Sequence, residues 1–553
     1  MPTSDFDSRL TTMPVTPYLN RLTIIGLFCL SLILFTWGLR SEEIISFDSR
    51  FYLFALEMWQ TGPSWFPTTY HEPYPDYLAT STLLIYFVAM LLGSMNKLAA
   101  VLPSAIAASL TVVLTYMIGA LNNKRLGLYA AFFLLLTVAF LKNARGIALD
   151  MYPTMITALC FYLVYSAQIK SKPCRAGWIY PLLVLGFAFR GPIGLVIPTG
   201  VICTYYLLDL NIRKFFITGF IALILLIVCA ITLLGLAYHV GGSVFLHDVL
   251  RMQVVGRIDN SYLPAYFYFV DGMRNYAPSF PMACLTVIGV VIYFKEIPHA
   301  KFLLKLIGWV VIILLGMSIP GDKKTRYILP MVPAIALLAA YPFAITIGKK
   351  YFVLLRSIFL RIFLYFPAIF LLVTEAIFFY AKNRELDFGI HYLSIVITLI
   401  VMQLIALSIV FRYLTDAVKR EVPIVFIATL SFVMTYIAVI EPIELSINRA
   451  RDFVTTIEAE RLQQHAHLVF FKERPDSLPI KYLVNMSHDL PNAEQPIFIG
   501  DTQSLLGFTQ PAFFITSASY FESLSKEVMA KFEIIASDKI GRVRVIVFKR
   551  KSS

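Results

Sequence analysis

The sequence predicts an all-α membrane protein that crosses the bilayer about 13 times and ends in a small soluble α/β domain. Of its 553 residues, 58% are apolar and 15% are charged. Apolar runs of the length that a bilayer requires, about 17 to 25 residues, recur from Leu22 to Ile440. After that point the composition becomes polar, and short apolar runs alternate with helical patterns, as in a small α/β domain.

These changes in composition divide the chain into an N-terminal polar segment (1–21), a transmembrane domain (22–440) and an outer α/β domain (441–553). The first apolar run, 22–39, has no small-residue cleavage site after it, so we expect an anchor rather than a cleaved signal. A polar loop at 41–77 follows. The remaining spans are expected over 98–121, 126–141, 151–168, 178–189, 193–208, 215–238, 278–294, 302–319, 327–347, 358–380, 392–413 and 424–440.

The net charge of +13 is concentrated in short loops between apolar runs, where it determines topology rather than indicating nucleic-acid binding. If the short apolar run 78–93 does not span, all six basic connections fall on the cytoplasmic side together with the N-terminus. We therefore expect 78–93 to be a re-entrant or membrane-parallel helix, with loop 41–77 and the C-terminal domain outside the cytoplasmic membrane.

This topology brings charged residues from many loops to the outer face. They are Asp48, Arg50, Glu72, Asp76, Arg145, Asp150, Arg190, the loop 239–276 and the segment 321–326. Ionisable side chains at the ends of apolar helices are functional candidates. The six cysteines show no spacing typical of a disulfide framework or a zinc site. The sequence also contains no glycine-rich phosphate loop, and no nucleotide cofactor is expected.

Loop 41–77 carries a series of short motifs. Segments 48–51, 55–58, 62–65 and 70–73 read DSRF, ALEM, GPSW and YHEP. In this order they resemble the first external loop of the GT-C glycosyltransferases, most closely the branch of aminoarabinose-lipid A transferases and protein O-mannosyltransferases. Two positions depart from that pattern: Phe47 replaces the first residue of an acidic pair, and Pro73 replaces a Lys.

Three further segments, within a resemblance that covers roughly residues 20 to 335, match motifs of the same branch. Arg145 and Asp150 match an Arg-x-x-x-x-Asp-Met motif, and Arg190 begins a counterpart of Lys-Gly-Pro. Segment 323–330, KKTRYILP, resembles a motif that ends in Tyr-Ile-Leu-Pro. The resemblance implies a GT-C fold and a sugar transferred from a polyprenyl phosphate.

The resemblance also implies roles for two acidic residues. Asp48 is the candidate catalytic base, although capping of the following helix is an alternative, and Glu43 is the nearest carboxylate upstream. Asp150 is the second catalytic candidate, on the acceptor side. Its side chain could also cap the next helix or orient Arg145.

Cationic side chains are needed to bind the phosphate of the substrate. The candidates are Arg50, Arg145, Arg190, Arg257, Lys324 and Arg326. Contact with anionic lipid headgroups is the alternative for Lys323 and Lys324.

Glu72 matches a residue that binds substrate and a divalent metal in the family. Arg257 fits the Arg of the family's His-x-x-Arg pair, but Val254 replaces the His, so a metal at Glu72 stays an open alternative.

The resulting hypothesis is a glycosyltransferase in the cytoplasmic (inner) membrane that uses a polyprenyl-phosphate sugar donor on the outer side. Its acceptor would be lipid A, a protein or a glycan, and its other partners membrane lipids rather than nucleic acid. A transporter or flippase of polyprenyl-linked sugars, or a scaffold for the soluble domain, are the alternatives. A transporter would place charges near mid-membrane in repeated halves. Here the charges collect at one face without a repeat, which favours the enzyme.

Overall fold

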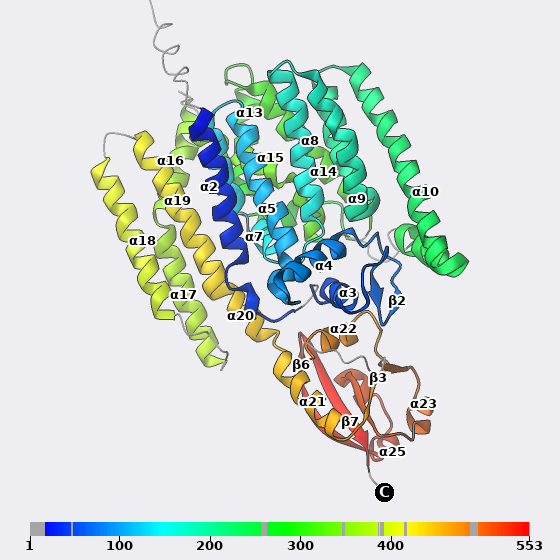
Figure 1. Cartoon of the computed structure of the whole chain (residues 1–553). Coiled ribbons are helices and arrows are strands. Elements are labelled where there is room, and N and C mark those ends of the chain that lie inside the picture. Colours follow the sequence, from blue (N-terminus) through cyan, green and yellow to red (C-terminus); the bar gives the residue numbers. More distant parts are fainter. Residues whose placement is uncertain are drawn as a thin grey trace, which may run out of the picture.

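The structure is a computed structural model, and it describes residues 17–45, 48–255, 263–321, 323–344, 349–384, 386, 392–413, 417–486 and 496–551. Figure 1 shows a bundle of long helices with a compact α/β domain at one of its ends. The predicted fold class, a helical membrane bundle followed by a small α/β domain, is confirmed.

The long helices of the bundle run roughly parallel or antiparallel (Figure 1). They are α2 (Pro17–Thr36), α5 (Lys97–Ala120), α6 (Lys124–Leu136), α8 (Met151–Ile169), α9 (Ile179–Leu208), α10 (Ile212–Leu250), α13 (Ser279–Ile292), α14 (Ala300–Ser318), α15 (Val332–Ala344), α16 (Lys350–Leu364), α17 (Phe366–Asn383), α18 (Tyr392–Arg412) and α19 (Ala417–Thr435). In the described residues, eight helical stretches are long and apolar enough to cross a membrane, or up to ten if each bent pair is one span. The count of about 13 stays a prediction.

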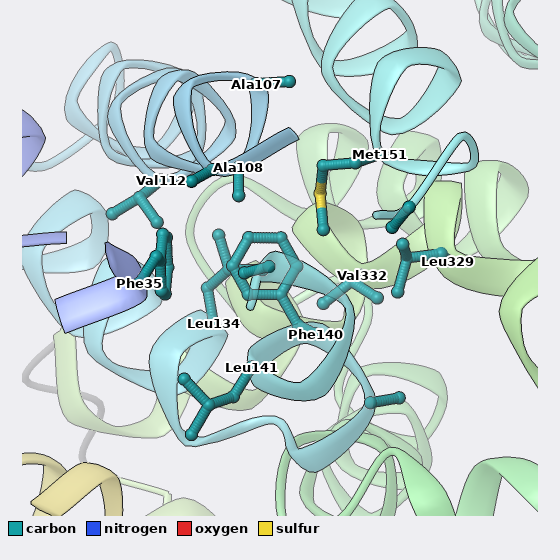
Figure 2. Packing of buried hydrophobic residues seen from close by; sticks show 14 of the residues in the cluster. Phe35, Ala107, Ala108, Val112, Leu134, Phe140, Leu141, Met151, Leu329 and Val332 are labelled. Atoms are coloured by element: carbon teal, nitrogen blue, oxygen red, sulfur yellow. The ribbon is translucent and has the colours of Figure 1, made fainter. Parts of the chain in front are cut away.

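Burial separates an inner from an outer set of helices. The span that contains α15 is fully enclosed, whereas α10, α17 and α18 expose most of their apolar surface, as lipid-facing helices do. The side chains drawn in Figure 2 belong to the enclosed core and include Phe35, Ala107, Ala108, Val112, Leu134, Phe140, Leu141, Met151, Leu329 and Val332. This core packs α7 (Val138–Ala144) and the start of α8 against α5 and α15.

Helix α9 contains a chain reversal that divides it into two arms. Arg190 has non-helical dihedral angles, and Gly191 has a φ of +58°. A Cβ placed on Gly186 would lie only 2.2 Å from the carbonyl oxygen of Gly194, so the arms before and after the turn are in direct contact. The turn at Arg190 therefore lies at the meeting point of the two arms, as expected from the separate apolar runs 178–189 and 193–208.

The short apolar run 78–93 forms α4 (Thr80–Leu92), which packs against α3 and α5. Its 13 residues rise about 20 Å, less than the hydrocarbon core of a bilayer. Figure 1 shows α4 across the end of the bundle that faces the α/β domain. The helix fits the expected membrane-parallel arrangement.

Helix α19 continues without interruption through a π-helical turn, η5 (Tyr436–Ile440), into α20 (Glu441–Ile447). The α/β domain follows with α21 (Arg451–Gln463), β3 (His467–Phe471), α22 (Leu478–Leu483), β4 (Ile497–Ile499), α23 (Thr502–Gly507), β5 (Ala512–Ser517), α24 (Ala518–Glu522), α25 (Lys526–Met529), β6 (Phe532–Ile540) and β7 (Val543–Arg550). Its sheet has the strand order β4-β3-β5-β7-β6, in which β3 is parallel to β4 and β5 while β7 is antiparallel to β5 and β6.

Both faces of this sheet are covered, because alternate residues of its strands point to opposite sides. Leu468 and Phe470 of β3 join the core that continues into the bundle. Val469 and Phe471 of the same strand belong to a separate core beneath α23 and α24. The α/β domain is thus packed onto the bundle and also has a core of its own.

The first loop lies between the bundle and the α/β domain. It contains η1 (Leu39–Ser41), α3 (Asp48–Thr61) and a hairpin of β1 (Thr68–Thr69) and β2 (Glu72–Pro73). Buried Glu57 of α3 accepts hydrogen bonds from the backbone N–H groups of Tyr70 (2.6 Å) and His71 (3.2 Å), which both have positive φ. The Tyr70 hydroxyl donates to the carbonyl of Pro475 in the α/β domain. A buried carboxylate thus shapes the loop that joins the two parts.

We predict that Glu57→Gln destabilises the protein by about 2 kcal/mol, because one carboxylate oxygen becomes an amide N–H that faces another N–H. The measurement is the thermal unfolding midpoint in detergent. Glu72→Gln, at an exposed position of the same hairpin, is the matched control and should unfold like the wild type. An unchanged midpoint for Glu57→Gln would show that the hairpin does not depend on this carboxylate.

Candidate active site

A cavity of about 650 Å³ opens at the end of the bundle that faces the α/β domain. Its volume is in the range of small-molecule sites. It brings together six of the candidates from the sequence: Asp48, Arg145, Asp150, Arg190, Lys324 and Arg326. The first loop, α7, the start of α8, the α9 turn, segment 323–326 and the end of the last span all contribute to its lining.

Asp48 begins α3 and reaches across to the segment before α8. Its Oδ2 accepts a hydrogen bond from the backbone N–H of Ile147 at 3.1 Å. A Cβ on Gly146 would lie 3.1 Å from the same oxygen, so a glycine at this position lets the carboxylate approach the backbone. Burial raises the pKa of the Asp48 carboxyl above its ordinary value, while the Ile147 N–H and the charges of Lys97 and Arg326 oppose that rise. A carboxylate that is a stronger base than usual is held in the cavity.

Glu43, the other carboxylate considered for the base, lies elsewhere. It accepts a hydrogen bond from the backbone N–H of Ala450 at 3.3 Å and pairs with Arg449 at 3.7 Å. Both partners precede α21, and Glu43 does not line the cavity. The position of the two carboxylates therefore favours Asp48.

Asp150 bridges two arginines that come from distant parts of the chain. Its Oδ1 lies 2.8 Å from Nε of Arg190, and its Oδ2 lies 3.1 Å from Nε of Arg326. Asp150 and Arg190 are only 3% and 5% exposed. Its side chain makes no capping hydrogen bond to α8, although Asp150 occupies the N-cap position. The observed contacts of the Asp150 side chain are therefore with Arg190 and Arg326. It neither caps α8 nor contacts Arg145, the two alternatives considered from the sequence.

Three cationic side chains lie around the aromatic ring of Tyr327. Arg190, Lys324 and Arg326 place their charged groups 5.8, 5.9 and 5.8 Å from the ring centroid of Tyr327. Arg190 also lies 5.5 Å from the centroid of Tyr77, the last residue of the first loop. Three cations around one ring, with a single carboxylate between two of them, create a local excess of positive charge.

Gly191 allows Tyr77 to pack against the α9 turn. A Cβ at this position would meet Cε1 of Tyr77 at 2.1 Å, and a φ of +58° is unfavourable for other residues. The Gly of the Arg-Gly-Pro motif is thus explained by local geometry. The absence of a side chain at Gly191 lets Tyr77 of the first loop pack against the turn, next to Arg190.

Arg145 was expected to bind substrate, but its donors are already used. Nε donates to Glu441 at 2.7 Å, and the other guanidinium nitrogens donate to backbone carbonyls at the end of α2 and to Glu42. Arg145 is only 2% exposed. In this structure Arg145 therefore joins α2, the first loop and α20 with all of its N–H groups, and its role in substrate binding stays a prediction.

Two other candidates, Arg50 and Glu72, are not part of the cavity lining, and a third cannot be placed. Arg50 pairs with Asp476 of the α/β domain at 3.2 Å and lies beside the Tyr74 ring, so its α3 position directs it away from the cavity. Glu72 is exposed on β2 and does not line the cavity. Arg257 lies outside the described residues.

The described residues around Glu72 form no metal site. Among the described residues, no group of three or more His, Cys, Asp or Glu side chains is close enough to hold a metal ion. Metal sites in proteins need several such ligands converging on one point. No step of the chemistry proposed below involves a metal.

The cavity also contains residues that motif reasoning missed. Lys97, at the start of α5, is buried and donates to Glu42 at 2.7 Å, and Lys142 pairs with Glu444 of α20 at 2.6 Å. Arg542, in the turn between β6 and β7, brings the α/β domain into the lining. Lys97 and Glu441 could have been found as charges at the ends of apolar runs on the outer face. Arg542 has no such signal.

The fold and the cavity define a class of protein: the chain has the GT-C fold, with a charged cavity at the end of the bundle that carries the α/β domain. It is structurally similar to ArnT from Cupriavidus metallidurans in the apo state, with a TM-score of 0.69 and 15% identity over 96% of this chain and 98% of that one. The ArnT structure bound to undecaprenyl phosphate matches equally well, at 0.69 and 16% identity over 95% and 98% of the two chains. The expected GT-C resemblance is confirmed.

A family model described as dolichyl-phosphate-mannose-protein mannosyltransferase matches residues 80–234. The archaeal oligosaccharyltransferase AglB from Archaeoglobus fulgidus, in complex with an inhibitory peptide and a dolichol-phosphate, gives a TM-score of 0.46 and 11% identity over 94% of this chain and 73% of that one. No curated protein gave a sequence match.

We predict that Asp150→Asn lowers stability by about 3–5 kcal/mol, because two guanidinium groups lose the carboxylate that compensates their burial. The thermal unfolding midpoint in detergent measures the effect. Asp501→Asn is the control: Asp501 is exposed and caps α23, and Asn caps a helix as well as Asp does. If the two variants unfold alike, the bridge does not stabilise the fold.

Proposed function

We propose that the protein is an integral-membrane glycosyltransferase that moves a sugar from a polyprenyl-phosphate donor to an acceptor at the outer face of the cytoplasmic membrane. One observation carries this proposal: in one cavity, a half-buried carboxylate with a raised pKa lies with a cluster of cations around Tyr327. Sugar transfer from a lipid phosphate needs both a base for the acceptor and positive charge for the leaving group.

The proposed reaction is a single displacement. The acceptor oxygen or nitrogen forms a bond to the anomeric carbon, and Asp48 takes the proton that the acceptor loses. The bond between that carbon and the phosphate oxygen breaks, and polyprenyl phosphate leaves with the electron pair. Arg190, Lys324 and Arg326 stabilise the additional negative charge on the phosphate. Asp150 is a positioning residue that holds two of these guanidinium groups in place.

The donor class is supported by the similarity to a protein whose structure contains undecaprenyl phosphate and by the family model with a lipid-linked sugar in its description. The acceptor class is a lipid such as lipid A, a protein or a glycan. The transporter alternative is less well supported, because the clustered charges of the cavity lie at one end of the bundle. Comparing the lipid A and the surface glycoproteins of cells with and without the gene by mass spectrometry would identify the acceptor.

The role of Asp48 is tested by Asp48→Asn. We expect turnover with the identified acceptor to fall by about 10²–10⁴-fold, the usual contribution of a positioned base, while binding of undecaprenyl phosphate is retained. Arg326→Ala differs from this variant in that it should weaken binding of undecaprenyl phosphate, because a charged hydrogen-bond partner worth about 1.5–3 kcal/mol is lost. Glu43→Gln is the matched control and should retain turnover.

The raised pKa of Asp48 predicts the pH dependence as well. The base must be deprotonated, so activity falls as the pH drops through its pKa, and this acid limb should lie above the ordinary value of about 3.9 for Asp. Near-normal turnover of Asp48→Asn, or loss of turnover in Glu43→Gln alone, would assign the base to another group.

The orientation is tested by cysteine labelling in a background without the six native cysteines. We predict that Ser64→Cys in the first loop and Ser519→Cys in the α/β domain react with an impermeant reagent from outside, because the basic connections belong on the cytoplasmic side. Restoring only Cys174, which is exposed in a basic connection, provides the inward-facing control. Labelling of Ser64→Cys from the cytoplasm alone would reverse the proposed orientation.

A further inference from the structure

A second cavity lies among α16, α18 and α19, and the proposed function does not use it. Its volume is about 490 Å³. Figure 1 shows α16 and the adjoining part of α19 towards the end of the bundle far from the α/β domain. The cavity is lined by Val353, Arg356, Ser357, Leu360, Arg361, Leu364, Val410, Arg420, Glu421 and Ile424.

Among the described residues that line this cavity, the positive charges outnumber the negative ones. Arg356 donates to both carboxylate oxygens of Glu421, with Nε at 2.9 Å from Oε1, and this pair is internally neutral. Arg361 and Arg420 contribute the remaining positive charge. Nε of Arg420 is buried and has no hydrogen-bond partner within the part of the chain that the structure describes. Buried N–H groups in proteins are generally hydrogen-bonded, so an acceptor is expected at this position.

The other half of the lining is aliphatic. Leu360 and Leu364 of α16 face the same cavity as Val410 of α18 and Ile424 of α19. A small soluble anion would satisfy the arginines but leave this surface without a partner. A ligand with a phosphate at one end and a hydrocarbon chain at the other fits both halves.

The surroundings favour a membrane lipid as this ligand. Val353, at the edge of the cavity, and Leu354 beside it are 53% and 59% exposed, as lipid-facing side chains are. The cavity lies at the end of the bundle where α6 begins with Lys124 and Arg125, so that membrane surface is positively charged. Basic pockets between transmembrane helices on the cytoplasmic side bind anionic headgroups.

We propose that the cavity among α16, α18 and α19 binds an anionic phospholipid. The phosphate accepts hydrogen bonds from Arg361 and Arg420, and an acyl chain packs along Leu360 and Leu364. This site is separate from the candidate active site and does not rest on the proposed glycosyl transfer.

The experiment is a lipid titration of the full-length protein in detergent, followed by native mass spectrometry. We expect phosphatidylglycerol to bind at least about tenfold more tightly than phosphatidylcholine. The double variant Arg361→Gln, Arg420→Gln should lose roughly thirtyfold in affinity for phosphatidylglycerol, the effect of two cations at about one kcal/mol each. Lys295→Gln, Lys301→Gln has the same change of charge at exposed positions outside the cavity and should bind like the wild type.

A second variant tests the aliphatic half without changing the charge. Leu360→Trp fills the cavity and should weaken phosphatidylglycerol binding while the protein remains monodisperse. Equal affinities for the two lipids, or wild-type binding by both cavity variants, overturns the proposal. Displacement of phosphatidylglycerol by inorganic phosphate at equal concentration would also overturn it, since the site would then select a free phosphate.

Discussion

The architecture of the candidate active site depends on the carboxylate of Asp150 between two guanidinium groups. Arg190 and Arg326 are held at the end of a helical bundle, where an unpaired charge is costly. One carboxylate shared by two arginines compensates part of their charge. The same contact brings the turn of α9 and the segment before α15 to the start of α8, so it determines where the cations lie.

A second charged cluster, around Arg145, also lines the cavity. Arg145 joins the end of α2, Glu42 of the first loop and Glu441 of the last span. All five of its guanidinium N–H groups donate to oxygens within the protein. The two clusters therefore differ in composition: Arg145 is one cation with two carboxylates, Glu42 and Glu441, whereas Arg190 and Arg326 share the single carboxylate of Asp150.

The α/β domain is a structural part of this end of the molecule. Tyr70 and Arg50 of the first loop contact residues 475 and 476, and Arg542 of the β6–β7 turn reaches the cavity lining. The loop that carries Asp48 is thus held between the bundle and the α/β domain. Movement of the domain would be transmitted directly to the loop, because Glu57 fixes the hairpin and α3 to each other.

The sequence by itself determined the membrane bundle, the α/β domain and six residues that share a cavity. The reason is that a bilayer excludes charge, so charged residues at the ends of apolar runs must meet at its surfaces, and the order of the runs assigns each end to a face. Only the tertiary structure decided which partners each of these charged side chains contacts. Arg145 and Arg190 look alike in sequence, yet the partners of Arg145 lie about one hundred residues before it and nearly three hundred after it. It also decided that Arg50 and Glu72 point away and that Lys97 and Arg542 take part, because side chains pair over a few ångströms, and only folding sets those distances between remote segments.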